Sequence, residues 1–262
     1  MAKPKLLLVD GSSLAFRAFF SILDLNRFKN SNGLHTNALY SFHRMFKSIL
    51  DSEKPTHVLV AWDAGKTTFR TEMYADYKGG RSKTPGEFIE QMPYFNVLLD
   101  AWGIPHYRLN QYEADDIIGT LAKQGEAAGY EVVVLSGDKD LIQLADNNIT
   151  VKITTKGVTE LVEYTPEVIF EKYGLTPEQI IDMKGLMGDS SDNYPGVTKV
   201  GEKTAVKLLQ EFGSVEGIYE HVDEMKKSKL KENLINDKEL AFLSKKLARI
   251  NVESPLEITL DD

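Results

Sequence analysis

The chain has 262 residues, with 31 Lys and Arg against 39 Asp and Glu, which gives a formal net charge of −8. As a bulk value, this charge argues against a protein that binds nucleic acid, because phosphate favours a basic surface. The chain has no cysteine, which excludes disulfides, thiolate metal sites and cysteine nucleophiles and predicts a cytoplasmic protein. The first apolar run, Leu6–Val9, is too short for a signal peptide or a membrane span, so we expect no membrane partner.

Three apolar runs predict buried strands, at residues 5–9, 57–62 and 131–135. Segments with helical periodicity lie between these runs, at 13–23, 36–50, 87–101 and 113–128. Strands that alternate with helices of about ten or more residues predict an α/β fold with a mostly parallel central sheet flanked by helices. In such sheets, binding sites form at the carboxyl ends of the strands.

The segment 64–85 differs from its surroundings, because it combines basic residues, two tyrosines and a Gly-Gly pair with little apolar periodicity. Beside the end of a strand, such a stretch predicts a functional loop or helix pair rather than core. From about residue 176 onward, strand patterns give way to short helices separated by Gly and Pro. We therefore expect an α/β body, residues 1–175, and a helical subdomain, residues 176–262.

Acidic residues gather at the predicted strand ends and at the helix starts that follow them. Their positions are Asp10, Asp63, Glu113, Asp115, Asp116, Asp138 and Asp140. Taken singly, several would serve as ordinary helix caps or turn residues. Brought to one sheet edge, these carboxylates would repel one another unless cations neutralised them. Oxygen ligands without Cys or well-placed His select Mg²⁺ or Mn²⁺, and a pair of such ions assists attack of water on a phosphodiester.

A second candidate region is the segment 185–203, GLMGDSSDNYPGVTKVGEK. It supplies Asp189 and Asp192, which share one face if the segment is helical. Gly196 and Gly201 then predict a hairpin between two short helices, whose backbone N–H groups can grip phosphates without reading bases. The alternative interpretation is an ordinary connection between helices, with no ligand.

Other functions expect residues that this chain lacks. A P-loop would need a glycine where Val60 stands, or a lysine where Glu202 stands. A phosphatase with an aspartate nucleophile would need a second aspartate where Ser12 stands. A DNA-structure-binding module without catalysis is the remaining alternative, and it would be expected to lack part of the acidic set.

Five motifs resemble, in this order, those of the 5′-nuclease (flap endonuclease) family: LLLVDGSSLAFRAFF, AWDAGKTTFRTEMYADYKGGR, YEADDIIGTLA, LSGDKDLIQL and KGLMGDSSDNYPGVTKVGEKTAVKLLQEFGS. The resemblance covers nearly the whole chain and is closest to the exonuclease domains of bacterial DNA polymerases. It implies a PIN-like parallel-sheet core, a helical arch over the site (about 64–95) and a helix–three-turn–helix DNA clamp (about 185–220).

The same resemblance implies a monomeric 5′→3′ exonuclease or flap endonuclease that acts in DNA replication and repair. Its substrates would be DNA with a 5′ flap, a nick or a 5′ end, including RNA primer strands. The chain would be linked to polymerase domains, or it would be a stand-alone paralogue.

The resemblance also implies roles for groups of residues. Acidic residues would hold two or more Mg²⁺ ions, for which Mn²⁺ can substitute: Asp10, Asp63, Glu113 and Asp115, with Asp116 among them or bridging, and a second group of Asp138, Asp140, Asp189 and Asp192. Two basic residues would contact the scissile phosphate as catalytic residues: Arg70 and Lys78. Their neighbours would handle the 5′ strand or stack on its bases: Tyr74, Tyr77 and Arg81. The clamp would contact DNA, and hold a K⁺ ion by backbone carbonyls, around Gly196, Lys199, Gly201, Lys203 and Thr204.

Overall fold

The computed structural model describes residues 2–155 and 160–262. Within them lies a six-stranded sheet in the order β3-β2-β1-β4-β5-β6. Its strands are β1 (Lys5–Asp10), β2 (His57–Trp62), β3 (His106–Arg108), β4 (Glu131–Ser136), β5 (Ile149–Thr154) and β6 (Leu161–Tyr164). The first five pair in parallel, and β6 is antiparallel to β5. The predicted α/β class is confirmed, and the predicted strands correspond to β1, β2 and β4.

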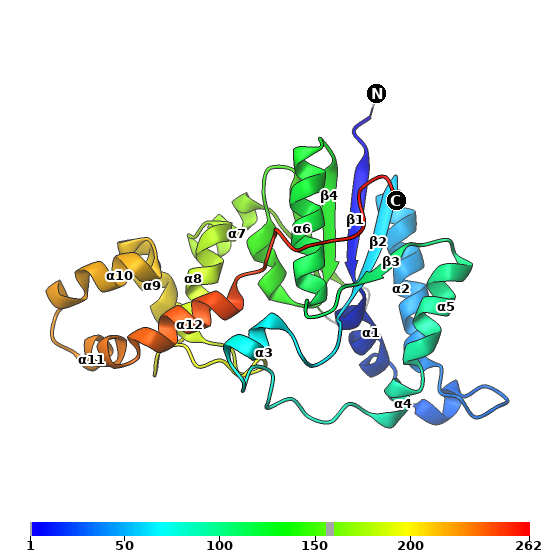
Figure 1. Cartoon of the computed structure of the whole chain (residues 1–262), viewed down its shortest axis with the longest axis horizontal. Helices are drawn as coiled ribbons and strands as arrows, with labels where there is room; N and C mark the ends of the chain where they lie inside the picture. The colour runs from blue at the N-terminus through cyan, green and yellow to red at the C-terminus, as the bar shows by residue number, and fades with distance from the viewer. Residues whose placement is uncertain (1, 156–159) are drawn as a thin grey trace.

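Helices cover both faces of the sheet (Figure 1), with α6 (Ala114–Ala127) on one face and on the other α1 (Gly11–Phe20), α2 (Asn37–Glu53) and α5 (Met92–Ala101). The alternation along β1 serves both faces. Leu6 and Leu8 pack in the core on the α6 side, whereas Leu7 and Val9 pack in the core on the α1 side. A central parallel strand needs an apolar residue at every position because both of its faces are covered, which explains the continuous run.

The helix predicted for 87–101 is divided in the structure into α4 (Gly86–Ile89) and α5. Pro93 lies in the first turn of α5. A proline has no backbone N–H and clashes with a preceding helical turn, so it begins a helix and cannot continue one. In the described part of the chain, three 3₁₀ segments accompany the helices: η1 (Leu25–Phe28), η2 (Lys139–Leu144) and η3 (Val222–Glu224).

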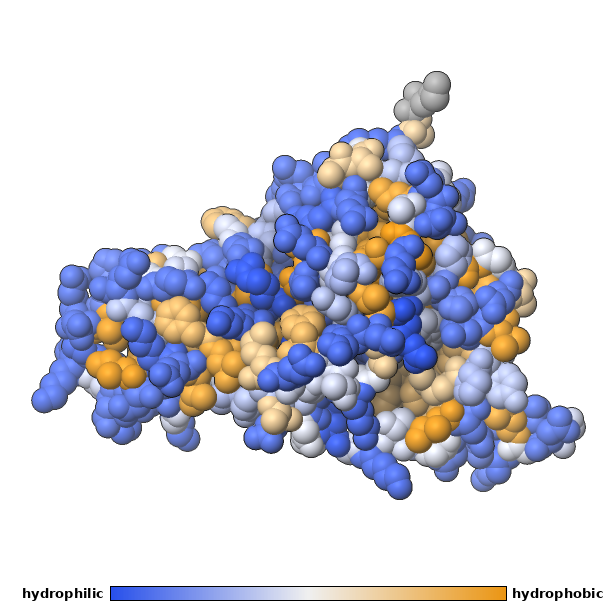
Figure 2. All heavy atoms as spheres, viewed as in Figure 1, coloured by the Kyte–Doolittle hydropathy of each residue, from blue (hydrophilic) through white to orange (hydrophobic). Residues whose placement is uncertain are grey.

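After β6 the chain forms an elongated helical lobe beside the sheet (Figure 1), as the loss of strand patterns predicts. Its helices are α7 (Pro166–Tyr173), α8 (Pro177–Met187), α9 (Glu202–Phe212), α10 (Val215–His221), α11 (Lys229–Asn236) and α12 (Lys238–Ala248). Figure 2 shows that the visible face of this lobe is largely hydrophilic, with a few apolar side chains between the charged ones. Among the described residues, none of the helices has the length and apolar surface needed to span a bilayer.

After α12 the chain runs back across α6 to the body, and we call residues 249–262 the C-terminal strap (Figure 1). Ile250 packs directly on α6, because a Cβ added to Gly119 would lie 2.6 Å from Ile250 Cγ2. Thr120 Oγ1 donates to the carbonyl of Asn251 at 3.2 Å and accepts from the N–H of Ser254 at 3.0 Å. The strap therefore ties the helical lobe to the helix that begins at the sheet edge.

Candidate active site

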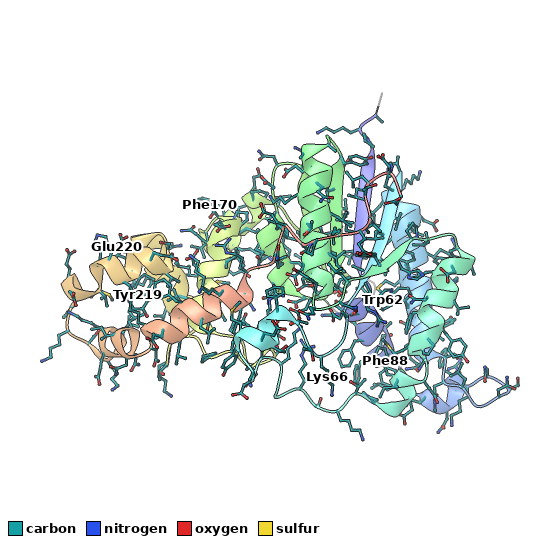
Figure 3. All side chains as sticks on the ribbon, in the orientation of Figure 1. Trp62, Lys66, Phe88, Phe170, Tyr219 and Glu220 are labelled. Carbon is teal, nitrogen blue, oxygen red and sulfur yellow. The ribbon has the colours of Figure 1, made fainter. Side chains whose placement is uncertain are left out.

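Three parallel strands end at one edge of the sheet, and each delivers a carboxylate there. Asp10 is the last residue of β1 and accepts a hydrogen bond from Ser136 Oγ at 2.7 Å. Asp63 follows β2, whose end is marked by Trp62 in Figure 3, and Asp138 follows β4. These side chains lie close enough for Asp63 and Asp138 to act electrostatically on Asp10. The carboxyl-terminal edge of the sheet therefore brings these three carboxylates together, as the positions of the strand ends predict.

The start of α6 joins the same edge. Asp63 Oδ1 accepts a hydrogen bond from the N–H of Ala114 at 2.8 Å. Glu113 caps α6, and Asp115 and Asp116 lie in its first turn. Asp115 lies within electrostatic reach of Asp10, Asp63 and Asp138, so it belongs to the strand-end group.

A tighter acidic trio lies on the side of the helical lobe. Asp138, Asp140 and Asp192 each offer a carboxylate oxygen within 4.8 Å of the others. Asp192 comes from the loop between α8 and α9. The segment is not helical there, so the condition under which Asp189 and Asp192 would share a helical face is not met. Asp189 is paired with Tyr194 by backbone hydrogen bonds of 3.0 and 3.1 Å, and its Oδ1 accepts from a loop N–H at 2.8 Å. Asp189 thus shapes the loop that presents Asp192.

Crowding and burial shift the acidity of these carboxylates. Burial, reinforced by Asp63, raises the pKa of Asp10 to about 7. Burial, reinforced by Asp138, raises the pKa of Asp140 to about 7. Burial and the negative charge of Asp10 raise the pKa of Asp115 well above its ordinary value. The protein without cations therefore retains protons where positive charge is needed.

The donor set fits divalent cations. All its ligand atoms are carboxylate oxygens, which Mg²⁺ and Mn²⁺ prefer. Asp140 Oδ1 is buried, and its one close cationic neighbour among the described residues, the ammonium of Lys184 at 2.9 Å, is poorly aligned for a hydrogen bond. A buried carboxylate oxygen beside two further carboxylates is the arrangement expected for a cation ligand.

Arg70 occupies a different place from the predicted one. Its side chain is 2% exposed and pairs with Glu113 at 2.6 Å and with both oxygens of Asp116 at 2.8 Å. The same guanidinium donates to the backbone carbonyls of Leu247 at 2.9 Å and Arg249 at 2.8 Å. With its donors thus committed to buried acceptors, Arg70 has none directed at a phosphate. The geometry argues against direct phosphate contact by Arg70 and against metal ligation by Asp116.

Tyr77 is also turned inward. It is 7% exposed, its hydroxyl donates to Glu113 Oε2 at 3.2 Å, and its ring stacks on Tyr194 at a centroid distance of 6.4 Å. A ring enclosed in this way has no free face for a base, so the geometry argues against the predicted stacking role. Tyr74 is half-buried against the same small cluster of apolar residues.

The segment of about 64–95, predicted as the arch, spans from the sheet to the helical lobe and back. Leaving β2, it passes Lys66 (Figure 3), forms α3 (Phe69–Met73), and returns to α5 through α4. At its far point, Lys78 donates its N–H to the carbonyl of Asp192 at 2.7 Å and places its ammonium group against Glu113. Arg81 pairs with Asp192 at 2.6 Å. Both basic residues therefore lie over the acidic groups.

The predicted hairpin lies between α8 and α9, and its residues are either buried or exposed. Gly196 is buried with φ +61°, and a Cβ there would lie 2.3 Å from the nitrogen of Gly188. It serves the close approach of two backbones, and the geometry argues against DNA contact at this position. Lys199, Gly201 and Lys203 are exposed, and Thr204 is half-exposed beside them.

Sequence reasoning missed Lys184, which lies between the trio and the loop. Its Nζ is 2.9 Å from Asp140 Oδ1 and 2.8 Å from Asp189 Oδ2. The signal that points to it is a lysine on the apolar stretch IIDMKGLM of α8.

Residues 5–174 match a family model described as 5′-3′ exonuclease, N-terminal resolvase-like domain, and residues 175–262 match one described as 5′-3′ exonuclease, C-terminal SAM fold. DNA polymerase I of Lactococcus lactis subsp. lactis (strain IL1403) is 63% identical over 263 residues, which cover 99% of this chain and 30% of that protein. The chain thus spans about 30% of the length of this curated relative.

Solved structures of bacteriophage T5 proteins share the fold. The T5 5′-exonuclease with bound zinc matches with a TM-score of 0.76 at 27% identity, over 94% of this chain and 90% of that chain. The T5 flap endonuclease in a pseudo-enzyme–product complex with DNA and metal ions matches with a TM-score of 0.73 at 27% identity, over 95% and 89%. The two family models together account for the sheet with its acidic edge and for the helical lobe, and the chain belongs to the 5′-3′ exonuclease family.

Proposed function

We propose that the chain is a structure-specific 5′→3′ exonuclease and flap endonuclease that hydrolyses DNA phosphodiesters near junctions of single-stranded and double-stranded DNA. Its substrates would be DNA with a 5′ flap, a nick or a 5′ end, including RNA primer strands. The observation that carries the proposal is the acidic trio Asp138, Asp140 and Asp192 beside the strand-end carboxylates, under a basic segment that spans the site. The T5 flap endonuclease complex with DNA and metal ions supports it.

In this proposal the chain is the nuclease part of a larger protein. The curated relative, DNA polymerase I, extends well beyond the matched region. A nuclease joined to polymerase domains would remove primers and damaged strands ahead of synthesis. The α/β body (1–175) would carry most of the acidic groups, and the helical subdomain (176–262) would contribute Asp192 and hold the duplex.

Mg²⁺ is the proposed cation, with two or more ions bound and Mn²⁺ as a substitute. Asp10, Asp63 and Asp115 would hold one ion, and the trio would hold another. When bound, such ions stabilise negative charge on the phosphate and make a nearby water more acidic. The chain's own contribution is orientation: Ser136 fixes Asp10, and the N–H of Ala114 fixes Asp63.

Lys78 and Arg81 are the proposed phosphate contacts. The ammonium group of Lys78 pairs with Glu113, and the guanidinium group of Arg81 pairs with Asp192. A phosphate beneath the arch segment would offer the two cations new charged acceptors. Because negative charge grows on the phosphoryl oxygens as the reaction proceeds, cations placed there favour the transition state over the ground state.

The helical lobe is the proposed duplex clamp. Lys199, Gly201 and Lys203 are exposed at the turn before α9. Gly201 caps α9 without a side-chain hydrogen bond, so the first N–H groups of that helix are free to contact a backbone phosphate. A K⁺ ion held by backbone carbonyls of this turn would add positive charge at the same place.

A cleavage assay tests the proposal. A 5′-flap duplex labelled at its 5′ end is incubated with Mg²⁺, with Mn²⁺ or with EDTA, and the products are sized to one nucleotide. We expect cleavage at the junction with either cation and none with EDTA. Asp63→Ala and Asp138→Ala should abolish cleavage while flap binding survives, whereas Asp146→Ala, at an exposed ion pair with Lys123, should cleave normally. Binding without cleavage by the wild-type chain would make it a DNA-structure-binding module.

A further inference from the structure

Lys184 is a buried cation at the edge of the acidic trio. Its side chain is 16% exposed, and its Nζ lies 2.9 Å from Asp140 and 2.8 Å from Asp189. Its neighbours on α8 include Ile180, Ile181 and Met183, all buried. A lysine in such surroundings loses hydration, and it is tolerated because two carboxylates compensate for the loss.

The two carboxylates that contact Lys184 differ in their other hydrogen bonds. Asp189 is saturated by the loop, since its Oδ1 accepts from the N–H of Ser191 at 2.8 Å and from the hydroxyl of Ser191 at 2.5 Å. Asp140 belongs to the trio, and its Oδ1 lies beside Nζ without a well-directed hydrogen bond. Lys184 therefore neutralises part of the charge of Asp140 by direct contact with that oxygen.

The charge on Lys184 is a permanent feature of the site. Lysine is a cation at neutral pH, and the ammonium of Lys184 lies within 3 Å of a carboxylate oxygen of Asp140 and of Asp189. The positive charge is thus held by contact with one of the carboxylates that a divalent cation would share.

We propose that Lys184 is a built-in counter-ion of the trio Asp138, Asp140 and Asp192, and that it weakens the binding of a divalent cation there. The inference rests on the proposed function, because it takes the trio to be a cation site. A unit positive charge in contact with one ligand competes with a second cation for the same negative charge. The trio is therefore a weaker cation site than the same three carboxylates would be without Lys184.

Manganese binding measures this effect without any cleavage. Mn²⁺ is titrated into the DNA-free protein, and free Mn²⁺ is followed by electron paramagnetic resonance. In the wild type we expect a tight and a weak class of site. Lys184→Met should tighten the weak class by about tenfold or more, because it removes the competing charge and keeps the chain length. Lys184→Arg keeps the charge, so its affinity should stay close to that of the wild type.

Lys245 provides a matched control. It is 14% exposed and bridges Asp182 at 2.6 Å and Glu216 at 2.8 Å, so it is a buried two-carboxylate lysine away from the trio. Lys245→Met should leave Mn²⁺ binding unchanged. Thermal melting in EDTA verifies that each variant is folded. If Lys184→Met does not fold, Lys184→Gln, which keeps a donor for Asp189, is titrated in its place.

The outcomes separate this inference from the proposed function. Asp192→Asn should remove the weak class in both backgrounds, which assigns that class to the trio. Unchanged or weaker Mn²⁺ binding in the Lys184 variant would overturn the counter-ion role and leave the nuclease proposal standing. A wild-type protein whose Mn²⁺ binding is insensitive to Asp192→Asn would overturn the counter-ion role together with the trio as a cation site.

Discussion

Arg70 offers a direct test of the difference between the role predicted from the sequence and the role that the structure indicates. The sequence resemblance implies contact with the scissile phosphate, which predicts loss of activity with intact stability. The structure shows a buried guanidinium that joins Glu113 and Asp116 to the carbonyls of Leu247 and Arg249. Arg70→Met removes this hub and keeps the apolar part of the side chain.

The expected loss of stability follows from the contacts. Removing one partner of a buried ion pair costs about 3–5 kcal/mol, because the other charge stays buried and uncompensated. Asp116 is fully buried, and two backbone carbonyls lose their donor as well. We therefore expect the upper part of that range, about 4–5 kcal/mol, or a melting temperature lower by roughly 8–20 °C. Arg70→Lys keeps the positive charge but loses the planar guanidinium with its several N–H donors. It should lower the free energy of unfolding by about 1.5–3 kcal/mol.

Urea unfolding in EDTA, followed by far-UV circular dichroism, measures these values without a contribution from bound cations. Arg249→Met is the control, since the Arg249 side chain is 48% exposed and pairs with an exposed glutamate. That exposed pair should contribute less than about 1 kcal/mol. If Arg70→Met unfolds at the same urea concentration as the wild type but no longer cleaves a flap, the structural role is refuted. The result would then support the contact with the scissile phosphate that the sequence resemblance implies.

Three further predictions concern acidity, backbone and charge. Because the pKa of Asp10 and that of Asp140 are raised to about 7, the folded protein in EDTA holds protons that the unfolded chain has lost above pH 4. Thermal melts in EDTA should therefore show stability falling between pH 5 and pH 8, and Mg²⁺ should restore more stability at pH 8 than at pH 5. Equal restoration of stability at both pH values would contradict this. Gly196→Ala should cost about 2–3 kcal/mol in the same unfolding assay, because its Cβ would meet the Gly188 backbone at 2.3 Å. Lys78→Ala should lower the single-turnover cleavage rate by about 100-fold or more with a smaller loss of flap affinity, whereas equal losses would make Lys78 a binding residue.

The strand-end acids could be predicted from the sequence because their positions depend on local patterns. An apolar run, an aspartate and a helical pattern define a strand, its end and its crossover, and parallel connections bring such ends to one edge. Asp10, Asp63 and Asp138 follow this rule. The rule holds for them because no distant residue is needed to decide which edge they share.

Arg70, Tyr77 and Lys184 could not be assigned in this way. The guanidinium of Arg70 donates hydrogen bonds to the carbonyls of Leu247 and Arg249, which lie 177 and 179 residues further along the chain, next to the start of the C-terminal strap. Lys184 sits on an apolar helix, where the pattern alone favours a solvated lysine. Tertiary contacts decide whether a long basic side chain reaches a ligand or a buried carboxylate. The local periodicity of the sequence contains no information about these contacts.

The net charge can now be interpreted through these contacts. The nine predicted site acids outweigh the net charge of −8, since the remaining residues balance at +1. Compensating cations of two kinds lie against these acids. Arg70 is fully enclosed and holds Glu113 and Asp116 in the fold. Lys184, Lys78 and Arg81 are more exposed than Arg70, and they pair with Asp140, Glu113 and Asp192. A cation of the first kind reduces the number of acids available to a metal ion. Under the proposed function, cations of the second kind compete with a bound metal ion for the same carboxylates.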